Sequence, residues 1–177
     1  MSSVYGGLGA GKPAFGPVLF EAEGEGITEH FMSDCLRQLF AKWQDYRAGE
    51  ALPHEDRIDP LDFFRWLPNT MLVDVEERDG LLRFLVRLNG ETHVSIAGQN
   101  MVGQRFDEIP SVAKDEGMVI SVFQQAARSR QPHYWRRKFI NPAMRWNSYE
   151  RCLLPFVDDA GAVSTLLAVA QVLLTEK

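Results

Sequence analysis

The sequence predicts an α+β fold built on one antiparallel β-sheet with helices on one face. Two observations support this prediction: the chain holds five strand-like runs and two long amphipathic helical runs. A third is their order, which is helix, two strands, short helices, long helix and three strands. Strands that follow one another through short turns favour antiparallel pairing, and amphipathic helices need a sheet face to cover. The 177 residues suit one domain with an appended N-terminal segment.

Residues 1–27 are rich in glycine and proline and are predicted to form an N-terminal arm. Within them, Gly6 to Lys12 have the G-x-x-x-x-G-K spacing of a phosphate-binding loop. Such a loop follows a buried strand, opens a helix and continues with a hydroxyl residue that binds Mg²⁺. Here Pro13 follows the lysine, and too few residues precede Gly6 for a core strand. We therefore interpret this segment as a flexible tail and not as a nucleotide site.

Residues 28–49 are predicted to form a flanking amphipathic helix. Thr28 suits the N-cap position and Gly49 suits the C-terminal end. The apolar side chains recur at helical spacing and form one broad face. They are Phe31, Cys35, Leu36, Leu39, Phe40, Trp43 and Tyr46.

Residues 50–177 are predicted to form the main domain. Runs 70–77 and 81–88 suit two strands, and Asp79-Gly80 between them is a pair that tight hairpin turns prefer. Short helical and irregular pieces follow, and then an amphipathic helix over 111–130. Runs 133–140, 147–157 and 162–174 suit three further strands. The last run is apolar on both faces, so we expect it at the centre of the sheet.

Composition excludes several classes of protein. The formal net charge of −5 disfavours a general nucleic-acid binder, and no run of 18 apolar residues suggests a membrane span. The N-terminus lacks a secretory signal pattern, so we expect a cytoplasmic protein with Cys35 and Cys152 reduced. The four histidines are scattered, without partners at ligand spacing, which predicts no metal site.

An ordered set of short motifs resembles a bacterial family of stand-alone PAS-like proteins, over about residues 35–174. The set begins with Trp43, Asp59-Pro60 and Leu67-Pro68. It continues through residues 87–109, with three glycines, and residues 149–161. The resemblance implies a five-stranded antiparallel sheet with helices on one face and a small cavity between them. It also implies a non-catalytic sensory and regulatory module that acts by contacting signalling proteins, such as sensor kinases.

A small apolar ligand is the easiest occupant of such a cavity to accommodate, although the same side chains would also suit a solid core. The candidate lining residues are Phe84, Val86, Leu88, His93, Ile96, Met101, Phe106, Met118, Val122 and Phe123. No cofactor is assigned. Haem would need an axial ligand, for which only His93 is placed. Flavin adduct chemistry would need a cysteine that this region lacks, while non-covalent flavin stays an alternative.

Two surfaces are predicted to contact other proteins. In PAS proteins a flanking helix often packs on a second copy, so we expect a homodimer through Phe31, Leu36, Phe40 and Trp43. The alternative is that this face covers its own sheet. The second surface is a basic patch of Arg136, Arg137 and Lys138, interpreted as protected strand edge or as a docking site for an acidic partner, not for nucleic acid.

The main alternative to a regulatory module is a small enzyme with a cone-shaped isomerase-like fold. Such an enzyme needs a buried acid and base that face one cavity. Glu150 and Tyr149 are the only candidates on a predicted strand, and adjacent strand residues point to opposite faces. We therefore expect no catalytic activity.

Overall fold

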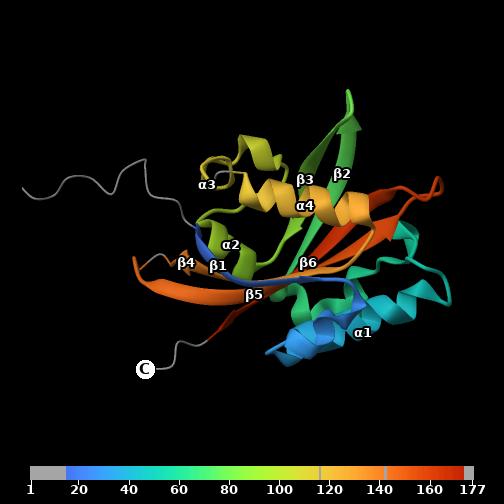
Figure 1. Cartoon of the computed structure of the whole chain (residues 1–177), viewed down its shortest axis with the longest axis horizontal. Coiled ribbons are helices and arrows are strands. Elements are labelled where there is room, and N and C mark those ends of the chain that lie inside the picture. The colour runs from blue at the N-terminus through green and yellow to red at the C-terminus, as the bar shows by residue number, and fades with distance from the viewer. Residues whose placement is uncertain (1–14, 116, 142, 174–177) are drawn as a thin grey trace, which may run out of the picture.

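A computed structural model of the chain describes residues 15–115, 117–141 and 143–173. It contains one six-stranded sheet in the order β1-β4-β5-β6-β2-β3, in which every neighbouring pair is antiparallel (Figure 1). The strands are β1 (Phe15–Glu23), β2 (Thr70–Arg78), β3 (Leu81–Asn89), β4 (His133–Ile140), β5 (Trp146–Val157) and β6 (Val163–Leu173). The predicted α+β class, the antiparallel sheet and the central position of the last strand are thus confirmed.

The strand count differs from the prediction because part of the predicted arm is a strand. Residues of β1 alternate between more and less buried positions and pair with β4 at the edge of the sheet. Pro17 lies within β1, and an edge strand tolerates proline because one of its sides has no neighbour to bond. The glycine–lysine motif of residues 6–12 lies outside the described residues.

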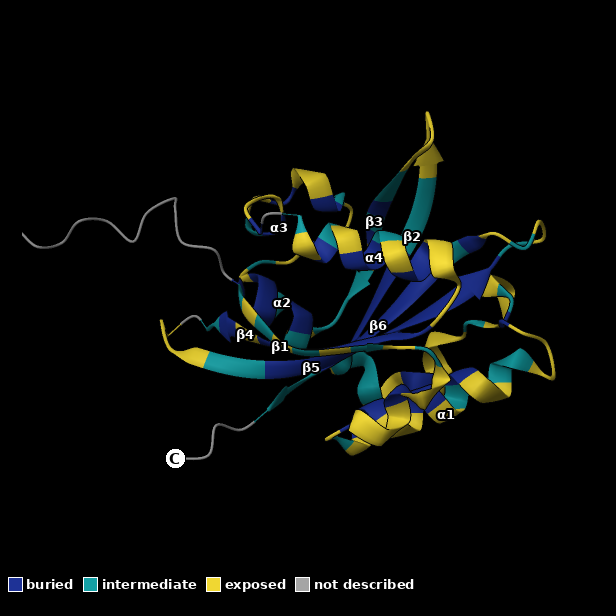
Figure 2. Ribbon diagram, in the orientation of Figure 1, coloured by how far each residue is buried: buried dark blue, intermediate teal, exposed yellow. Residues whose placement is uncertain are grey.

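The helices lie on both faces of the sheet, where the prediction placed them on one. Helices α2 (Glu91–Ala97), α3 (Pro110–Ala113) and α4 (Met118–Ser129) lie on one face, and α1 (Asp34–Arg47) lies on the other (Figure 1). Four 3₁₀ helices complete the described elements: η1 (Glu25–His30), η2 (Glu55–Arg57), η3 (Pro60–Asn69) and η4 (Phe106–Glu108). Because both faces are covered, most residues of β5 and β6 are buried, and the start of β5 and the end of β6 are less so (Figure 2).

The ends of the helices differ from the sequence prediction for local reasons. Helix α1 begins after Ser33, whose hydroxyl accepts a hydrogen bond from Leu36 N, whereas Thr28 lies in η1. The single helix predicted over 111–130 is divided into α3 and α4. Gly117, between them, has a φ of 76°, a left-handed conformation that interrupts a right-handed helix. In the part of the chain that the structure describes, no helix is long and apolar enough to span a membrane.

Candidate functional site

A small cavity lies between the sheet and the helices α2, α3 and α4. Its volume is about 30 Å³, which is room for roughly two water molecules. Strands supply one wall and the helices supply the other, so the cavity is in the position where the resemblance placed it. Its lining residues are Phe15, Met71, His93, Ile96, Ala97, Met101, Phe106, Val112, Val119, Tyr149 and Arg151.

The charged group in this lining is Arg151 of β5, which is only 4% exposed. Its Nε and Nη2 atoms have no hydrogen-bond partner among the described residues. Its guanidinium instead lies against the rings of Trp135, at 4.0 Å, and Phe123, at 5.0 Å. Burial lowers the pKa of Arg151 to about 10, so the side chain keeps its positive charge at neutral pH. Among the described residues, no carboxylate pairs with this buried cation.

Tyr149 lies two residues before Arg151 on β5 and so faces the same side of the sheet. Its hydroxyl lies near the indole N–H of Trp135, which opposes the rise in the pKa of Tyr149, yet the hydroxyl has no acceptor for its own proton among the described residues. Burial raises the pKa of Tyr149, which keeps the phenol protonated and able to donate a hydrogen bond.

His93 of α2 is the third polar group of the cavity lining. Its Nε2 atom lies 3.0 Å from the carbonyl oxygen of Asn69, which accepts a hydrogen bond from it. Burial, assisted by the positive charge of Arg151, lowers the pKa of His93 to about 4. The imidazole is therefore neutral near pH 7, and within the described lining the charge comes from Arg151.

A second buried arginine on the same face is fully paired. Arg137 of β4 binds both carboxylate oxygens of Asp115, one of them at 2.9 Å from Nη1. Its Nε donates to Gly16 O at 2.7 Å, which ties β1 to β4. Asp115 also accepts a hydrogen bond from Val119 N at 3.0 Å. Because its oxygens are engaged in this way, Asp115 forms no hydrogen bond with Arg151, and its charge offsets that of Arg151 only in part.

The structure places four of the ten predicted pocket residues in the cavity lining: His93, Ile96, Met101 and Phe106. Phe84, Phe106 and Phe123 form an aromatic cluster beside it, with centroid distances of 4.7–5.8 Å. Val86 and Val122 are buried, Leu88 is half-buried, and Met118 is exposed. Sequence reasoning missed seven lining residues, among them the polar Tyr149 and Arg151. The available signal was their spacing: Tyr149 and Arg151 share one strand face with Leu153 in a mostly apolar strand.

The cavity as it stands does not fit a large cofactor. Pockets for drug-sized ligands measure roughly 300–1,000 Å³, at least about tenfold more than the volume here. His93, the candidate haem ligand, already uses its Nε2 atom on the carbonyl of Asn69. Among the described residues no group of three or more His, Cys, Asp or Glu side chains is placed to hold a metal ion.

On the opposite face of the sheet, Glu150 holds the segment that leads into α1. Its carboxylate is fully buried and accepts hydrogen bonds from Met32 N at 2.8 Å and Ser33 N at 2.7 Å. The hydroxyl of Tyr134 also donates to it, at 2.9 Å. Glu150 thus lies outside the cavity that Tyr149 lines, so the acid and base of the isomerase alternative are separated by the sheet.

The four residues predicted to form a dimer surface lie in the core of a single chain. Phe31, Leu36, Phe40 and Trp43 are all buried, and Trp43 Nε1 donates to Pro155 O of β5 at 2.9 Å. This face therefore covers its own sheet, which was the alternative interpretation. A contact with a second copy in this conformation needs other side chains.

The predicted basic patch is divided by the alternation of β4. Arg137 faces the cavity side and is buried with Asp115, so it belongs to no surface patch. Arg136 points to the α1 side, against the ring of Phe20 and the sulfur of Met32. Of the three, only Lys138 is exposed.

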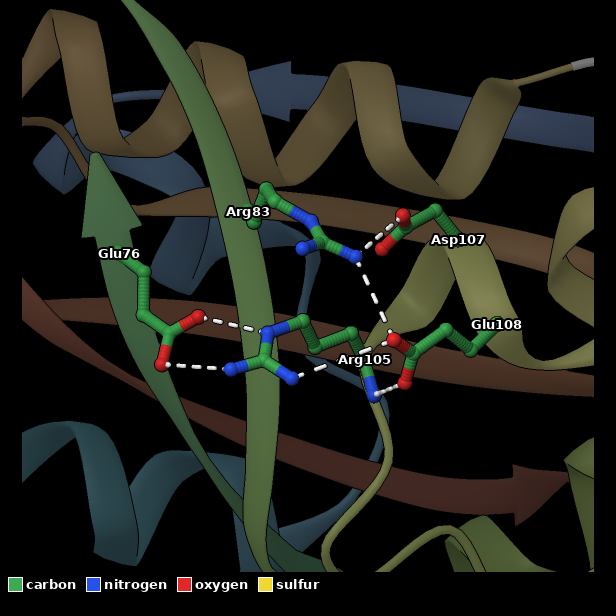
Figure 3. A network of polar contacts seen from close by, with 5 residues as sticks. All are labelled: Glu76, Arg83, Arg105, Asp107 and Glu108. Carbon is green, nitrogen blue, oxygen red and sulfur yellow. Dashed lines mark hydrogen bonds and ion pairs between the residues drawn. The ribbon is translucent and has the colours of Figure 1, made fainter. Parts of the chain in front are cut away.

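A network of charged side chains ties η4, which carries the cavity residue Phe106, to the β2–β3 hairpin. Arg105 Nε lies 2.8 Å from Glu76 Oε2, and Arg83 Nη2 lies 2.6 Å from Asp107 Oδ2 (Figure 3). Glu108 joins both arginines. These side chains are about one-third to one-half exposed, so each ion pair contributes modestly.

Comparison with known proteins identifies the family. A family model described as a PAS domain matches residues 31–171, which is most of the chain. The chain therefore belongs to the PAS-domain family. PAS domains are typically sensory and regulatory modules without catalytic activity of their own, which is the class that the sequence analysis predicted.

Two solved structures are similar at low sequence identity. The PAS domain of BvgS from Bordetella pertussis shares 20% identity, with a TM-score of 0.47, over 68% of this chain and 90% of that chain. An RNA-binding light-oxygen-voltage receptor shares 14% identity, with a TM-score of 0.46, over 68% of this chain. The matched part covers only 35% of that receptor. No curated protein matches the chain. Family membership accordingly rests on the match over residues 31–171.

Proposed function

We propose that this chain is a sensory module in which a small molecule in the cavity controls the docking of α1 and, through it, contacts with a partner protein. The observation that carries this proposal is the placement of two consecutive residues of β5. Arg151 lines the cavity on one face, and Glu150 holds the start of α1 on the other. A shift of this strand position therefore acts on both faces of the sheet at once.

The bonds of Glu150 make the start of α1 sensitive to small displacements. A carboxylate that accepts several hydrogen bonds in a buried site depends on accurate geometry, because charge-assisted bonds are strong and directional. Tyr134, which also binds Glu150, donates from the neighbouring strand β4. A ligand that pulls Arg151 toward the cavity would change the lengths and angles of the hydrogen bonds that Glu150 accepts. The amide groups of Met32 and Ser33, which donate two of these bonds, would then exchange their hydrogens at a different rate.

Surface residues beside α1 are the proposed contact with a partner. Leu61 and Phe64 of η3 are 78% and 71% exposed, which is unusual for large apolar side chains three residues apart. Element η3 is tied to α1, because Tyr46 Oη donates to Asp62 Oδ2 at 2.7 Å and Trp66 Nε1 donates to Gln38 Oε1 at 3.0 Å. We assign this surface to a signalling protein, such as a sensor kinase, or to a second copy of the chain.

The coupling can be tested without knowing the ligand, by filling the cavity with a side chain. Val119→Leu adds one methylene to the lining, which suits the small volume. We expect altered hydrogen–deuterium exchange at the amides of Met32 and Ser33, measured by NMR on the full chain. Val102→Leu, at a half-exposed position, is the matched control and should leave these amides unchanged. Unchanged exchange in Val119→Leu would contradict the proposed coupling.

A further inference from the structure

The buried charge of Arg151 is the feature of the cavity that its surroundings leave unexplained. Charged side chains are almost never fully buried unless a counter-charge or hydrogen bonds satisfy them. Two of the three guanidinium nitrogens have no partner among the described residues. The hydroxyl of Tyr149, on the same face of β5, is also unsatisfied there. Two donors that lack acceptors therefore line one cavity.

The charged groups that the structure describes around Arg151 leave its positive charge in excess. Asp115 is held by Arg137 and by Val119 N, so that neighbouring pair is neutral as a unit. His93 is uncharged near pH 7, and its own hydrogen bond goes to Asn69 O. The ring faces of Trp135 and Phe123 offset part of the desolvation cost, but they accept no hydrogen bond from Nε or Nη2.

We propose that the cavity is a binding site for a short carboxylate, of the size of formate or acetate, whose two oxygens accept hydrogen bonds from Arg151 and Tyr149. The ligand would supply the missing negative charge and the missing acceptors together. This inference rests on the proposed function, since it gives the chemical class of the molecule that occupies the same cavity.

The shape and lining of the cavity favour this class over other anions. A guanidinium presents its N–H groups in a plane and binds a planar carboxylate through two parallel hydrogen bonds. The volume of about 30 Å³ is too small for a phosphate ester or a nucleotide without movement of the walls. Most other lining side chains are apolar, among them Met71, Ile96 and Val112, and they suit a methyl group and not a second charged group.

The experiment is a titration of the full chain with ¹³C-labelled acetate and formate, followed by NMR of the ligand and of arginine Nε–H groups. We expect saturable binding and a shift of the Arg151 signal. Arg151→Met should abolish saturable binding, and Arg151→Lys should weaken it because the planar fork is lost. Tyr149→Phe should weaken binding about tenfold, the usual effect of removing one hydrogen bond to a charged group. Arg128→Met, which removes an exposed arginine on α4, is the control for net charge.

Tyr149→Phe keeps the test valid if variants of Arg151 fail to fold, because the hydroxyl that it removes has no partner in the described chain. Absence of saturable binding to the wild-type chain, or equal binding by Tyr149→Phe and wild type, would overturn the inference. If carboxylate binds while exchange at Met32 and Ser33 is unaffected, the inference stands and the proposed coupling fails. If Val119→Leu alters that exchange but carboxylates do not bind, the coupling stands and the ligand class is wrong.

Discussion

Two buried arginines on the cavity face of the sheet have opposite surroundings, and this sets what each contributes to stability. Arg137 binds Asp115 through two hydrogen bonds, whereas the described chain offers Arg151 no carboxylate. Removing one member of a buried ion pair leaves the other charge uncompensated, while removing an unpaired buried cation relieves a desolvation cost. The same chemical change should therefore have opposite consequences at these two positions, which lie on the neighbouring strands β4 and β5.

We expect Arg137→Met to lower the free energy of unfolding by about 3–5 kcal/mol, because it leaves the buried carboxylate of Asp115 without a counter-charge. Arg151→Met should leave that free energy unchanged or raise it, since methionine fills similar space without charge. Urea unfolding of the ligand-free chain, followed by circular dichroism, measures both values. An equal loss in the two variants would mean that the rings of Trp135 and Phe123 stabilise Arg151 as well as Asp115 stabilises Arg137.

At the residue scale, sequence reasoning predicted four lining residues, His93 among them, and missed the two polar residues of β5, Tyr149 and Arg151. Ile96, Met101 and Phe106 could be predicted as lining residues, because apolar side chains in a short-helix region tend to face the interior. Arg151 could not be predicted in this way, because a charged residue in a strand is usually solvated. It is buried only because helices cover both faces of the sheet at β5. Tyr149 was considered only as half of a catalytic pair with Glu150, which the sheet separates.

At the element scale, the junction between η3 and α2 depends on the absence of a side chain at Gly90. A Cβ atom there would lie 2.3 Å from Leu67 O and 2.5 Å from Pro68 O, both of them backbone atoms. The close approach also lets Gly90 N donate to Thr70 O at 2.7 Å, at the start of β2. Gly98, at the other end of α2, differs: its φ is 81° but its surroundings are open.

We expect Gly90→Ala to lower the free energy of unfolding by about 3 kcal/mol, because backbone atoms cannot yield as a flexible side chain does. Gly98→Ala should cost only about 1–2 kcal/mol, the price of a left-handed conformation for alanine. Thermal unfolding of both variants beside the wild type gives the comparison. A smaller loss for Gly90→Ala than for Gly98→Ala would contradict the close packing of η3 against α2.

Elements were predicted well where a local pattern determines them and poorly where the rest of the fold does. The β2–β3 hairpin follows from its alternation and from Asp79-Gly80, and the structure has strands on both sides of that turn. Strand β1 was assigned to an arm because glycine and proline mark irregular chain. Its strand structure depends on pairing with β4, more than a hundred residues later, and no local pattern encodes such a partner.

At the scale of the whole molecule, the sheet is covered on both faces, and this changes which surfaces are free for other proteins. The apolar face of α1 was predicted correctly as a pattern, but its amphipathicity alone does not say whether it covers its own sheet or a second copy. The structure has it against β5 and β6. The apolar side chains left exposed beside it, Leu61 and Phe64, are the better candidates for assembly.

We expect the chain to self-associate through this surface, and the double change Leu61→Asp with Phe64→Asp to weaken association at least about tenfold, as loss of central apolar contacts does. Neither side chain supports the core, so the variant should fold normally. Sedimentation velocity over a concentration series measures the effect. Leu81→Asp, which places a single aspartate on a leucine 64% exposed at the distant hairpin turn, is the control, to be compared with Leu61→Asp alone. A wild type that stays monomeric at every concentration would leave only a different protein as partner, whereas a double variant that associates like wild type would remove η3 from the interface altogether.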